Sequence, residues 1–564
     1  WESEKNKIRN FRTTLDSSQT LELTYFYEFV GFIAREHRSS KIGKRHEKGN
    51  DGFASLWNKP LKVKEQDYTV LAFLEYTHIE ETDAGIVEVH FNKTAKTLEV
   101  SRFRVGDFVL LYPQETNGSL QPTRHQILKA TIKKVGKNSL ALSPVNIHVK
   151  EGHFEAHLHW AIETEATNMS YDAMYQLLHQ FLSLMPFKKE LLLGTRQPKF
   201  GELPTVTFPN LKESQNKLVQ KALAAKDYFL LQGPPGTGKT KVMLKNLVAD
   251  LLKDPKEKLL LLAYTNRAVD EMCGAIKEIP DTPKFFRLGF AHATEHPDVV
   301  LSKFAKANNL KVLKDSIEEC RVFITTVLTY QRSTELRHFL EVKKGTNSAI
   351  QGDKFKITTI VDEASQLLEP QIVGILGNTD RFIWIGDEKQ LPAIVLQHAE
   401  TAVTDKEVLH EIELKRLSDS LFERLLKRCK KMGWTDAYGM LEYQGRMHEQ
   451  IAAFPNRYFY NGELKNFLPK QEIPVPDYLQ NVENSPKFLK VLQAHRSIFI
   501  KTDTEAERNR NIEEAKTVVW LLNQLAPLFA PEDLKNAIGV ITPYRAQIAE
   551  IRRQLDEGAY PDIT

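Results

Sequence analysis

A glycine-rich loop carries the clearest chemistry in the sequence. It lies between an apolar segment and a helical one and has the G-x-x-x-x-G-K-T pattern of a phosphate-binding loop. Backbone N–H groups of such a loop surround phosphate oxygens, and the following helix N-terminus adds a favourable dipole. We predict that Lys239 reaches the β- and γ-phosphates of ATP and that the Thr240 hydroxyl binds Mg²⁺. The predicted ATP-binding residues of the loop are Gly233, Pro234, Pro235, Gly236, Thr237, Gly238, Lys239 and Thr240.

Two adjacent carboxylates follow the apolar segment 357–361. Asp362 is predicted to hold Mg²⁺, and Glu363 to orient and deprotonate the attacking water. Such a pair can also begin a helix, where carboxylates interact well with the dipole. A phosphate-binding loop on the same predicted sheet favours the catalytic interpretation.

A third polar loop follows the apolar segment 382–385 at the same predicted sheet edge. Gln390 in this loop could sense the γ-phosphate. An amide that only bonds loop backbone is the alternative, and this residue alone does not decide between them.

Apolar segments alternate with helical ones from about residue 206, which predicts an α/β fold with a parallel sheet covered on both faces. Residues 66–150 contain short segments separated by turns and predict a small β-barrel. A helix is expected over 24–38, whereas the charged segment 39–52 could follow phosphates or be a solvated loop. The expected strands are 228–231, 259–264, 322–326, 357–361 and 382–385, with 497–501 and 538–541 in a second α/β region.

Together these loops resemble the motifs of superfamily-1 helicases. Their sequences are similar to the motifs of the 5′→3′ branch, superfamily 1B. This branch includes the nonsense-mediated-decay helicase, senataxin and the replication helicase-nuclease. The resemblance covers about residues 205–550. The matching segments are 262–270 for motif Ia, 362–365 for motif II, 386–392 for motif III, 441–448 for motif IV and 539–547 for motif IVa.

The resemblance implies further site residues. Gln215 corresponds to the glutamine that reads adenine, and Arg446 to an arginine finger of the second motor domain, which would neutralise charge on the γ-phosphate. Lys239, Asp362, Glu363 and Gln390 complete the implied catalytic set. The implied nucleic-acid contacts are Thr265, Asn266, Tyr544 and Arg545.

The resemblance also implies two RecA-like P-loop domains, an accessory barrel of the 1B type and a helical stalk. The expected domains are an accessory segment 1–65, a barrel 66–150, a stalk 151–205, a first RecA-like domain 206–405 and a second, incomplete one 406–564.

Two departures from the family pattern stand out. Gly445 occupies a position where the family usually has tyrosine near the base, and Tyr443 is a candidate substitute. Motifs V and VI, the latter with a second arginine finger, are expected beyond Thr564. We therefore expect a fragment that binds ATP but hydrolyses it poorly.

The implied activity is ATP-dependent 5′→3′ translocation or unwinding on single-stranded nucleic acid, with DNA slightly favoured over RNA. Two alternatives remain open: the motor part of a helicase-nuclease whose nuclease lies outside this chain, and an ATP-gated clamp or scaffold that does not unwind. The motif Ia and motif IV segments argue against a kinase or a transporter ATPase.

Charge, cysteine spacing and apolar runs say less about the ligands and the cellular compartment of the protein than the motifs do. The net charge of +4 neither requires nor excludes nucleic acid, because a basic groove can exist within a balanced total. The cysteines at 273, 320 and 429 show neither metal-binding nor disulfide spacing and fit a reducing compartment. The longest purely aliphatic run, 259–263, is far short of a membrane span. We expect an intracellular protein, in the cytoplasm, nucleoid or nucleus, that makes no membrane contact; its protein partners cannot be inferred.

Overall fold

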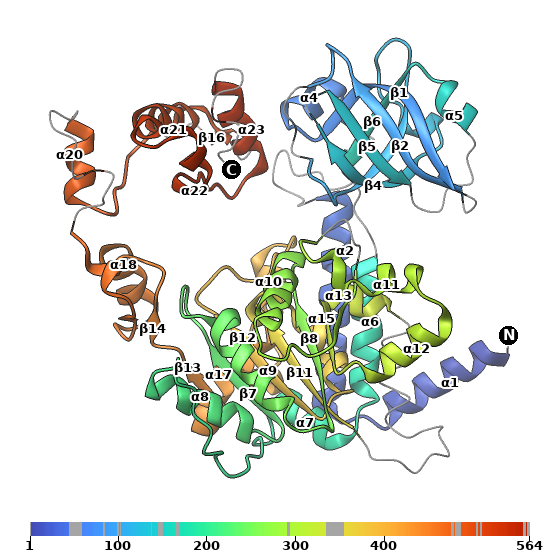
Figure 1. Cartoon of the computed structure of the whole chain (residues 1–564). Helices are drawn as coiled ribbons and strands as arrows, with labels where there is room; N and C mark the ends of the chain where they lie inside the picture. Colours follow the sequence, from blue (N-terminus) through green and yellow to red (C-terminus); the bar gives the residue numbers. More distant parts are fainter. Residues whose placement is uncertain are drawn as a thin grey trace. The chain divides into compact units, whose positions relative to one another are not determined.

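Seven parallel strands form the largest sheet of the computed structural model (Figure 1). The structure describes residues 2–43, 59–82, 85–98, 101, 103–136, 138–144, 151–164, 169–289, 294–333, 355–474, 479, 487–503, 506–507, 510–555 and 560. The strand order is β13-β7-β12-β11-β8-β10-β9. The strands are β7 (Tyr228–Gln232), β8 (Glu257–Ala263), β9 (Phe285–Arg287), β10 (Val322–Thr326), β11 (Lys356–Asp362), β12 (Arg381–Gly386) and β13 (Tyr438–Met440).

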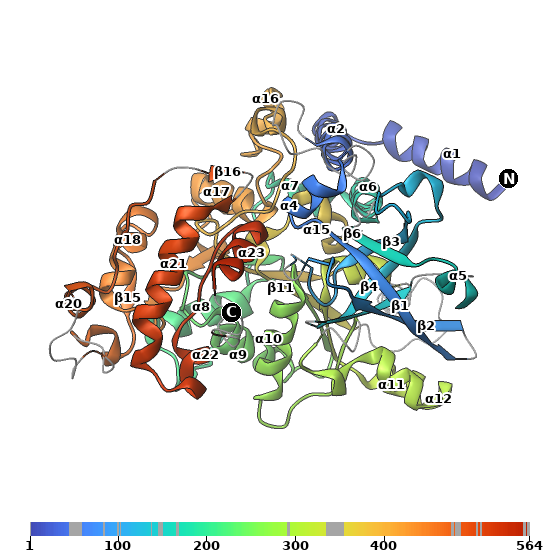
Figure 2. The ribbon, with the colours of Figure 1, turned by 90° about the horizontal axis from the view of Figure 1, so that it is seen from above.

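The five strands expected in this sheet are confirmed, while β9 and β13 were not predicted. β7, β8, β10 and β12 are buried along their whole length, as parallel strands covered on both faces must be. Two hydrophobic clusters, one on each face, account for this burial. Figure 2 shows helices on both sides of the sheet.

Different helices cover the two faces. One face carries α8 (Glu213–Ala224), α9 (Lys245–Leu251) and α10 (Asn266–Lys277). The other carries α2 (Thr20–Ile42), α6 (Met169–Leu182), α7 (Pro186–Leu193), α15 (Glu369–Leu376) and α17 (Leu421–Met432). The helix expected over 24–38 is confirmed within α2. Of the charged segment 39–52, residues 44–52 lie outside the described residues.

The chain divides into two units, one of residues 1–39 and 168–473 and the other of residues 40–167 and 474–564. This division does not follow the expected boundary at 405, which stays a prediction. β13 joins the seven-stranded sheet beside β7, and α17 packs into the hydrophobic cluster on one face of that sheet. Residues 406–473 therefore fall in the unit that contains the P-loop, and apolar side chains between 409 and 441 are buried against its sheet.

The first unit contains further helices and strands. They are α1 (Glu2–Asp16), α11 (Leu301–Ala307), α12 (Leu310–Glu319), α13 (Val327–Arg332), α16 (Glu407–His410), α18 (Glu449–Phe459), β14 (Tyr443–Gln444) and β15 (Lys465–Asn466).

A closed barrel in the second unit has the strand order β1-β2-β5-β4-β3-β6. Its strands are β1 (Val70–Thr82), β2 (Gly85–Lys93), β3 (Phe108–Gln114), β4 (Leu128–Val135), β5 (Ser139–Pro144) and β6 (His159–Thr164), with α4 (Leu61–Gln66) and α5 (Glu151–Glu155) nearby in sequence. The predicted barrel is present, but β6 corrects the expectation that 151–205 is helical. β6 pairs with both β1 and β3 and buries Trp160, so it closes the barrel.

The rest of the second unit is mainly helical. Its described elements are α20 (Lys487–Ala494), α21 (Ile512–Leu525), α22 (Leu534–Ala537), α23 (Arg545–Gln554) and the two-residue strands β16 (Ala506–Glu507) and β17 (Arg510–Asn511). The strands expected at 497–501 and 538–541 do not form. Phe499 is 91% exposed and Ile541 98% exposed. An apolar run becomes a strand only where a neighbouring strand takes up its hydrogen bonds, and neither run has such a neighbour among the described residues.

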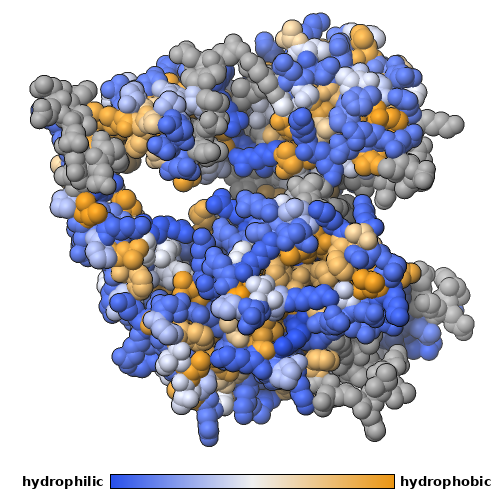
Figure 3. Space-filling view, viewed as in Figure 1, coloured by the Kyte–Doolittle hydropathy of each residue, from blue (hydrophilic) through white to orange (hydrophobic). Residues whose placement is uncertain are grey.

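Hydrophilic side chains cover most of the face seen in Figure 3, with hydrophobic ones scattered between them. Scattered exposed apolar side chains are normal on a folded protein. No helix within the described ranges is long and apolar enough to cross a membrane.

Candidate active site

The phosphate-binding loop follows β7, as the sequence predicts. Gly236 and Gly238 have φ angles of +77° and +79°, a backbone region that residues other than glycine rarely adopt. A Cβ atom on Gly233 would lie 2.2 Å from Cγ of Lys239. Glycine at this position therefore lets Lys239 fold back over the loop. The chain then enters a π-helical turn, Lys239–Leu244, which continues into α9.

The end of β11 places both predicted carboxylates against this loop. The Thr240 hydroxyl donates a hydrogen bond to Oδ2 of Asp362 at 2.6 Å. Lys239 Nζ lies 3.2 Å from Oε1 of Glu363. The structure thus brings together the four residues predicted to handle phosphate, metal and water.

Asp362 is 1% exposed, and burial raises its pKa to about 6, against partial compensation by the Thr240 hydroxyl. A buried carboxylate beside a hydroxyl is a hard-oxygen donor set, and a divalent cation would offset the cost of ionising it. Thr240 and Asp362 therefore fit Mg²⁺, as expected from the sequence.

Glu363 adopts an unusual backbone conformation, with φ at +52°. Non-glycine residues in this region cost free energy and often occur at functional sites. Gln366 Nε2 donates to Oε2 of Glu363 at 3.1 Å, so one carboxylate oxygen contacts Lys239 and the other Gln366. These contacts fix the direction of the predicted base.

Gln390 lines the same cavity, but its amide bonds a side chain. Its Nε2 donates to Oδ2 of Asp387 at 2.7 Å, and the Tyr460 hydroxyl donates to the same oxygen at 2.7 Å. Asp387 is fully buried. The contact orients Gln390, and its role toward a γ-phosphate stays a prediction.

Arg446 lies in the same unit as the phosphate-binding loop. Its expected place on a second motor domain stays a prediction. The Gly445 N–H donates to the Gly236 carbonyl at 2.9 Å. Oε1 of the fully buried Gln444 accepts the N–H groups of Arg446 and Met447, at 3.0 and 2.8 Å. The turn that carries Arg446 is therefore bonded to the loop that it is predicted to assist.

The end of the cavity that is predicted to bind the base has aromatic walls. Gln215 is buried near the start of α8, where its Oε1 accepts the Lys212 N–H at 2.9 Å. Tyr443 and Phe467 line the cavity with rings 6.4 Å apart, nearly perpendicular. Gly445 also lines it but offers no side chain, and Tyr443 stays the predicted substitute for the aromatic ring. Sequence reasoning missed Phe467, which reaches the site because β15 pairs with β14.

The cavity holds about 700 Å³, within the usual range for small-molecule sites. All of its residues belong to the first unit. The lining residues are Asn210, Gln215, Pro235, Gly236, Thr237, Gly238, Lys239, Thr240, Lys241, Val242, Glu271, Glu363, Gln390, Tyr443, Gly445, Arg446 and Phe467. Gly233, Pro234 and Asp362 do not line it, although Asp362 contacts Thr240 at its base.

The four predicted nucleic-acid contacts lie in two places. Thr265 caps α10, where its Oγ1 accepts the Ala268 N–H at 3.2 Å, and Asn266 Oδ1 accepts a bond from Arg287 at 3.2 Å. Both residues are exposed.

The other two contacts belong to the second unit. Tyr544 is 49% exposed just before α23, and Arg545 forms a 2.9 Å ion pair with Asp107. Exposure permits contact with a phosphate backbone, and the roles of all four residues stay predictions.

Comparison with known proteins finds ATP-dependent helicases among the relatives of this chain. Two family models, both described as "AAA domain", match the chain, one over residues 210–321 and 311–398 and the other over residues 417–563. An uncharacterized ATP-dependent helicase of Methanocaldococcus jannaschii is 25% identical, over 98% of this chain and 87% of its own length.

Two eukaryotic relatives are similar as well. The DNA replication ATP-dependent helicase/nuclease DNA2 of Mus musculus is 25% identical over 94% of this chain, which spans 48% of that protein. The DNA polymerase alpha-associated DNA helicase A of Saccharomyces cerevisiae is 22% identical over 86% of this chain and 80% of its own length.

Proposed function

The chain belongs to the superfamily-1B type of ATP-hydrolysing helicase, and from this premise we propose that it moves 5′→3′ along single-stranded nucleic acid, with DNA preferred over RNA. One observation supports the proposal most. The Thr240–Asp362 and Lys239–Glu363 contacts meet on one loop, and Arg446 lines the same cavity. This is the set of groups that phosphoryl transfer to water requires.

The contacts suggest an order of events. Lys239 is held by Glu363, so a γ-phosphate entering the loop competes for the ammonium group. Its arrival leaves a Glu363 oxygen to accept a proton from the attacking water. Arg446 then neutralises charge that develops on the transferred phosphoryl group. Bound Mg²⁺, held by Thr240 and Asp362, would supply positive charge to the phosphates.

Translocation also needs a structural link between this cavity and the bound nucleic-acid strand. Thr265 and Asn266 begin α10, and Glu271 of the same helix lines the nucleotide cavity. We propose that α10 links strand contact to nucleotide state. Contacts with phosphates carry no sequence information, so binding should be insensitive to sequence and fall steeply with salt.

ATP hydrolysis with single-stranded DNA, with RNA of the same sequence and without nucleic acid tests the substrate. The Lys239→Ala variant, which lacks the predicted phosphate-binding lysine, measures background hydrolysis. Strand displacement from duplexes with a 5′ or a 3′ overhang then tests direction. We expect stronger stimulation by DNA, and displacement only from the 5′ overhang, where the strand runs into the duplex in the 5′→3′ direction.

Other outcomes are equally informative. No stimulation by either polymer would contradict the motor proposal. ATP-dependent strand binding without displacement would favour a clamp or scaffold.

A second candidate is the motor part of a helicase-nuclease. The names of several relatives favour it, and the chain spans about half or less of those proteins. The candidate predicts that the natural full-length protein shortens labelled single-stranded DNA, which a helicase alone does not do.

A further inference from the structure

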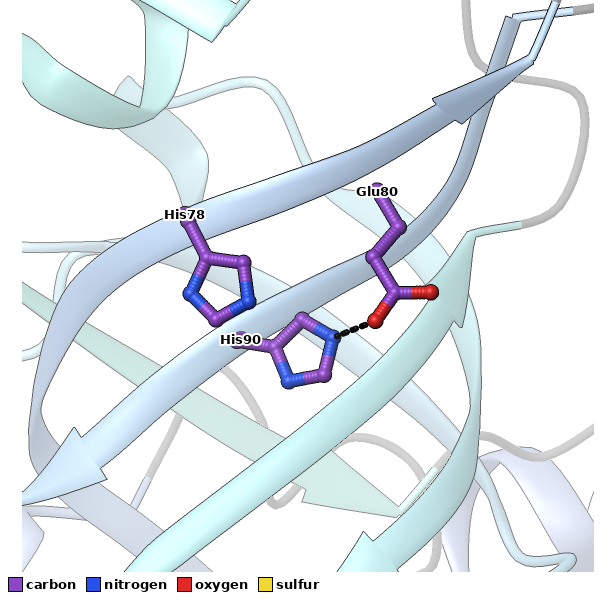
Figure 4. A group of neighbouring side chains, drawn as sticks. All are labelled: His78, Glu80 and His90. Carbon is purple, nitrogen blue, oxygen red and sulfur yellow. Dashed lines mark ion pairs between the residues drawn. The ribbon is translucent and has the colours of Figure 1, made fainter.

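Two histidines and a glutamate gather on the outer face of the barrel (Figure 4). His78 and Glu80 come from β1, and His90 from β2. One potential donor atom of each lies within 4.8 Å of those of the others. We propose that His78, Glu80 and His90, with Glu88 beside them, bind one divalent transition-metal ion, and that the donor set selects Zn²⁺.

The strand register places the four side chains on one face. His78 pairs with His90, Ile79 with Val89 and Glu80 with Glu88. Alternate residues of a strand point to opposite faces, and Val89 is fully buried in the barrel core. Hence the histidines and glutamates project outward together. Register shifts lie on both sides of this stretch, and such irregularities often occur beside functional sites.

The pairing of β1 with β2 places His78 opposite His90 and Glu80 opposite Glu88. Two carboxylates directly opposite each other repel, and so do two protonated imidazoles. The ion pairs of His90 with Glu80 and Glu88 balance only one of the two histidines. A shared cation relieves both conflicts, because neutral imidazoles and ionised carboxylates all donate lone pairs to it.

The distances match a zinc-sized centre. His90 Nε2 lies 3.3 Å from Oε1 of Glu80 and 3.6 Å from Oε2 of Glu88. Donors on a tetrahedron with ~2.0 Å bonds are about 3.3 Å apart. The His78 and His90 rings stack with centroids 4.3 Å apart and planes 6° apart, so one ring must turn out of this stack for a nitrogen of each to reach one ion. His90 Nε2 is shielded from solvent and makes no hydrogen bond.

Donor chemistry selects the ion. Imidazole nitrogen suits zinc and its neighbours among the transition metals, whereas Mg²⁺ and Ca²⁺ prefer all-oxygen sites. Two nitrogens with one or two carboxylates give a four-coordinate zinc site, with water completing it if Glu88 stays outside. Such a site would tie β1 to β2 on the outer face of the barrel.

Metal titration of the full chain tests the proposal. Bound metal is first removed with a chelator. The protein is then kept in saturating Mg²⁺, which occupies the Thr240–Asp362 site so that added Co²⁺ does not bind there. Co²⁺ is added while visible absorption is recorded, and Zn²⁺ then displaces it. We expect one equivalent of Co²⁺ with tetrahedral bands, displaced by Zn²⁺ at micromolar concentration or below, and a higher Tm with Zn²⁺.

Two double variants locate the site. His78→Gln with His90→Gln should weaken Zn²⁺ binding about 100-fold or more, since even an outer partner of a ligand is worth 10–100-fold. The control, His125→Gln with His157→Gln, removes two histidines elsewhere in the unit and should bind normally. Glu80→Gln, an exposed single change, should weaken binding without a folding defect. Equal affinity in all variants, loss in the control alone or binding only at millimolar Zn²⁺ would overturn the proposal.

Discussion

The P-loop edge of the first unit and the segment 487–555 of the second contain similar apolar runs, but only the first builds them into a sheet. β12 is buried throughout and has a strand on each side. The runs 497–501 and 538–541 form no strand and expose Phe499 and Ile541 almost completely. The residues of a short motif loop stand next to one another in the sequence, so the loop can be recognised there. A strand forms only where a partner strand, often far away in sequence, pairs with it.

The largest difference between the two regions should come from their arginines. Arg446→Ala should slow ATP hydrolysis by about 10³-fold or more, because a guanidinium at the γ-phosphate stabilises transition-state charge. Arg552→Ala removes an exposed arginine of α23 and should leave the rate within about twofold. Single-turnover hydrolysis without nucleic acid measures both.

Arg446→Lys sharpens this test. A lysine keeps the charge but loses the planar fork, so partial activity is expected. If Arg446→Ala hydrolyses ATP at the original rate, the arginine takes no part in the chemistry, and its place in the cavity reflects packing alone.

Buried and exposed apolar residues should differ next. Ile383→Ala in β12 should lower the free energy of unfolding by about 2–5 kcal/mol, since it opens a cavity in the sheet core. Phe499→Ala should change it by less than about 0.5 kcal/mol. Urea unfolding followed by circular dichroism compares them. A large loss for Phe499→Ala would mean that the run 497–501 is packed in solution.

Two buried carboxylates, one in each region, should respond to pH in opposite ways. Burial raises the pKa of Asp362 to about 6. Burial alone would also raise the pKa of Glu550, but hydrogen bonds from Arg553 and Gln554 outweigh it and lower the pKa. Folded Asp362 therefore binds its proton more tightly than the unfolded chain does, and folded Glu550 less tightly.

The signs follow by linkage. Ionised Asp362 opposes folding, so stability falls as pH rises from about 4 to 6, and Asp362→Asn should recover up to about 3 kcal/mol above pH 6. Glu550→Gln should instead destabilise the protein at neutral pH, and the loss should disappear as pH falls below the usual range of a glutamate. Thermal melts of nucleotide-free protein at several pH values test both. Destabilisation by Asp362→Asn at pH 8 would contradict the burial argument.

The sequence predicts the central site better than its surroundings, for a physical reason. Lys239, Thr240, Asp362 and Glu363 each end or follow an apolar run, and parallel strands bring such ends to one edge. Phe467 depends on β15 pairing with β14.

Long-range pairing also explains what the sequence missed in the barrel. The cluster of His78, Glu80 and His90 depends on the register of β1 against β2, and β6 on closure of the barrel. A single sequence contains no local signal for these pairings. The strands expected at 497–501 and 538–541 fail for the same reason, since apolar runs carry no information about their neighbours.

The smallest difference should come from two aromatic residues, Phe467 at the cavity and Tyr544 before α23. Phe467 lines the nucleotide cavity with Tyr443, and Lys212 Nζ lies 5.3 Å from the centre of its ring. Stacking of an aromatic ring on a base is worth about 1–3 kcal/mol. Phe467→Ala should therefore weaken binding of a fluorescent adenine nucleotide about tenfold, and Phe467→Tyr should restore it.

Tyr544→Ala supplies the contrast. It should leave nucleotide affinity unchanged and weaken binding of single-stranded DNA by a similar factor, because an exposed tyrosine offers a surface on which bases stack. Fluorescence anisotropy with each ligand in turn separates the two effects. If Phe467→Ala binds nucleotide normally while Tyr443→Ala does not, Tyr443 alone substitutes for the aromatic that Gly445 lacks, and Phe467 serves only to hold it in place.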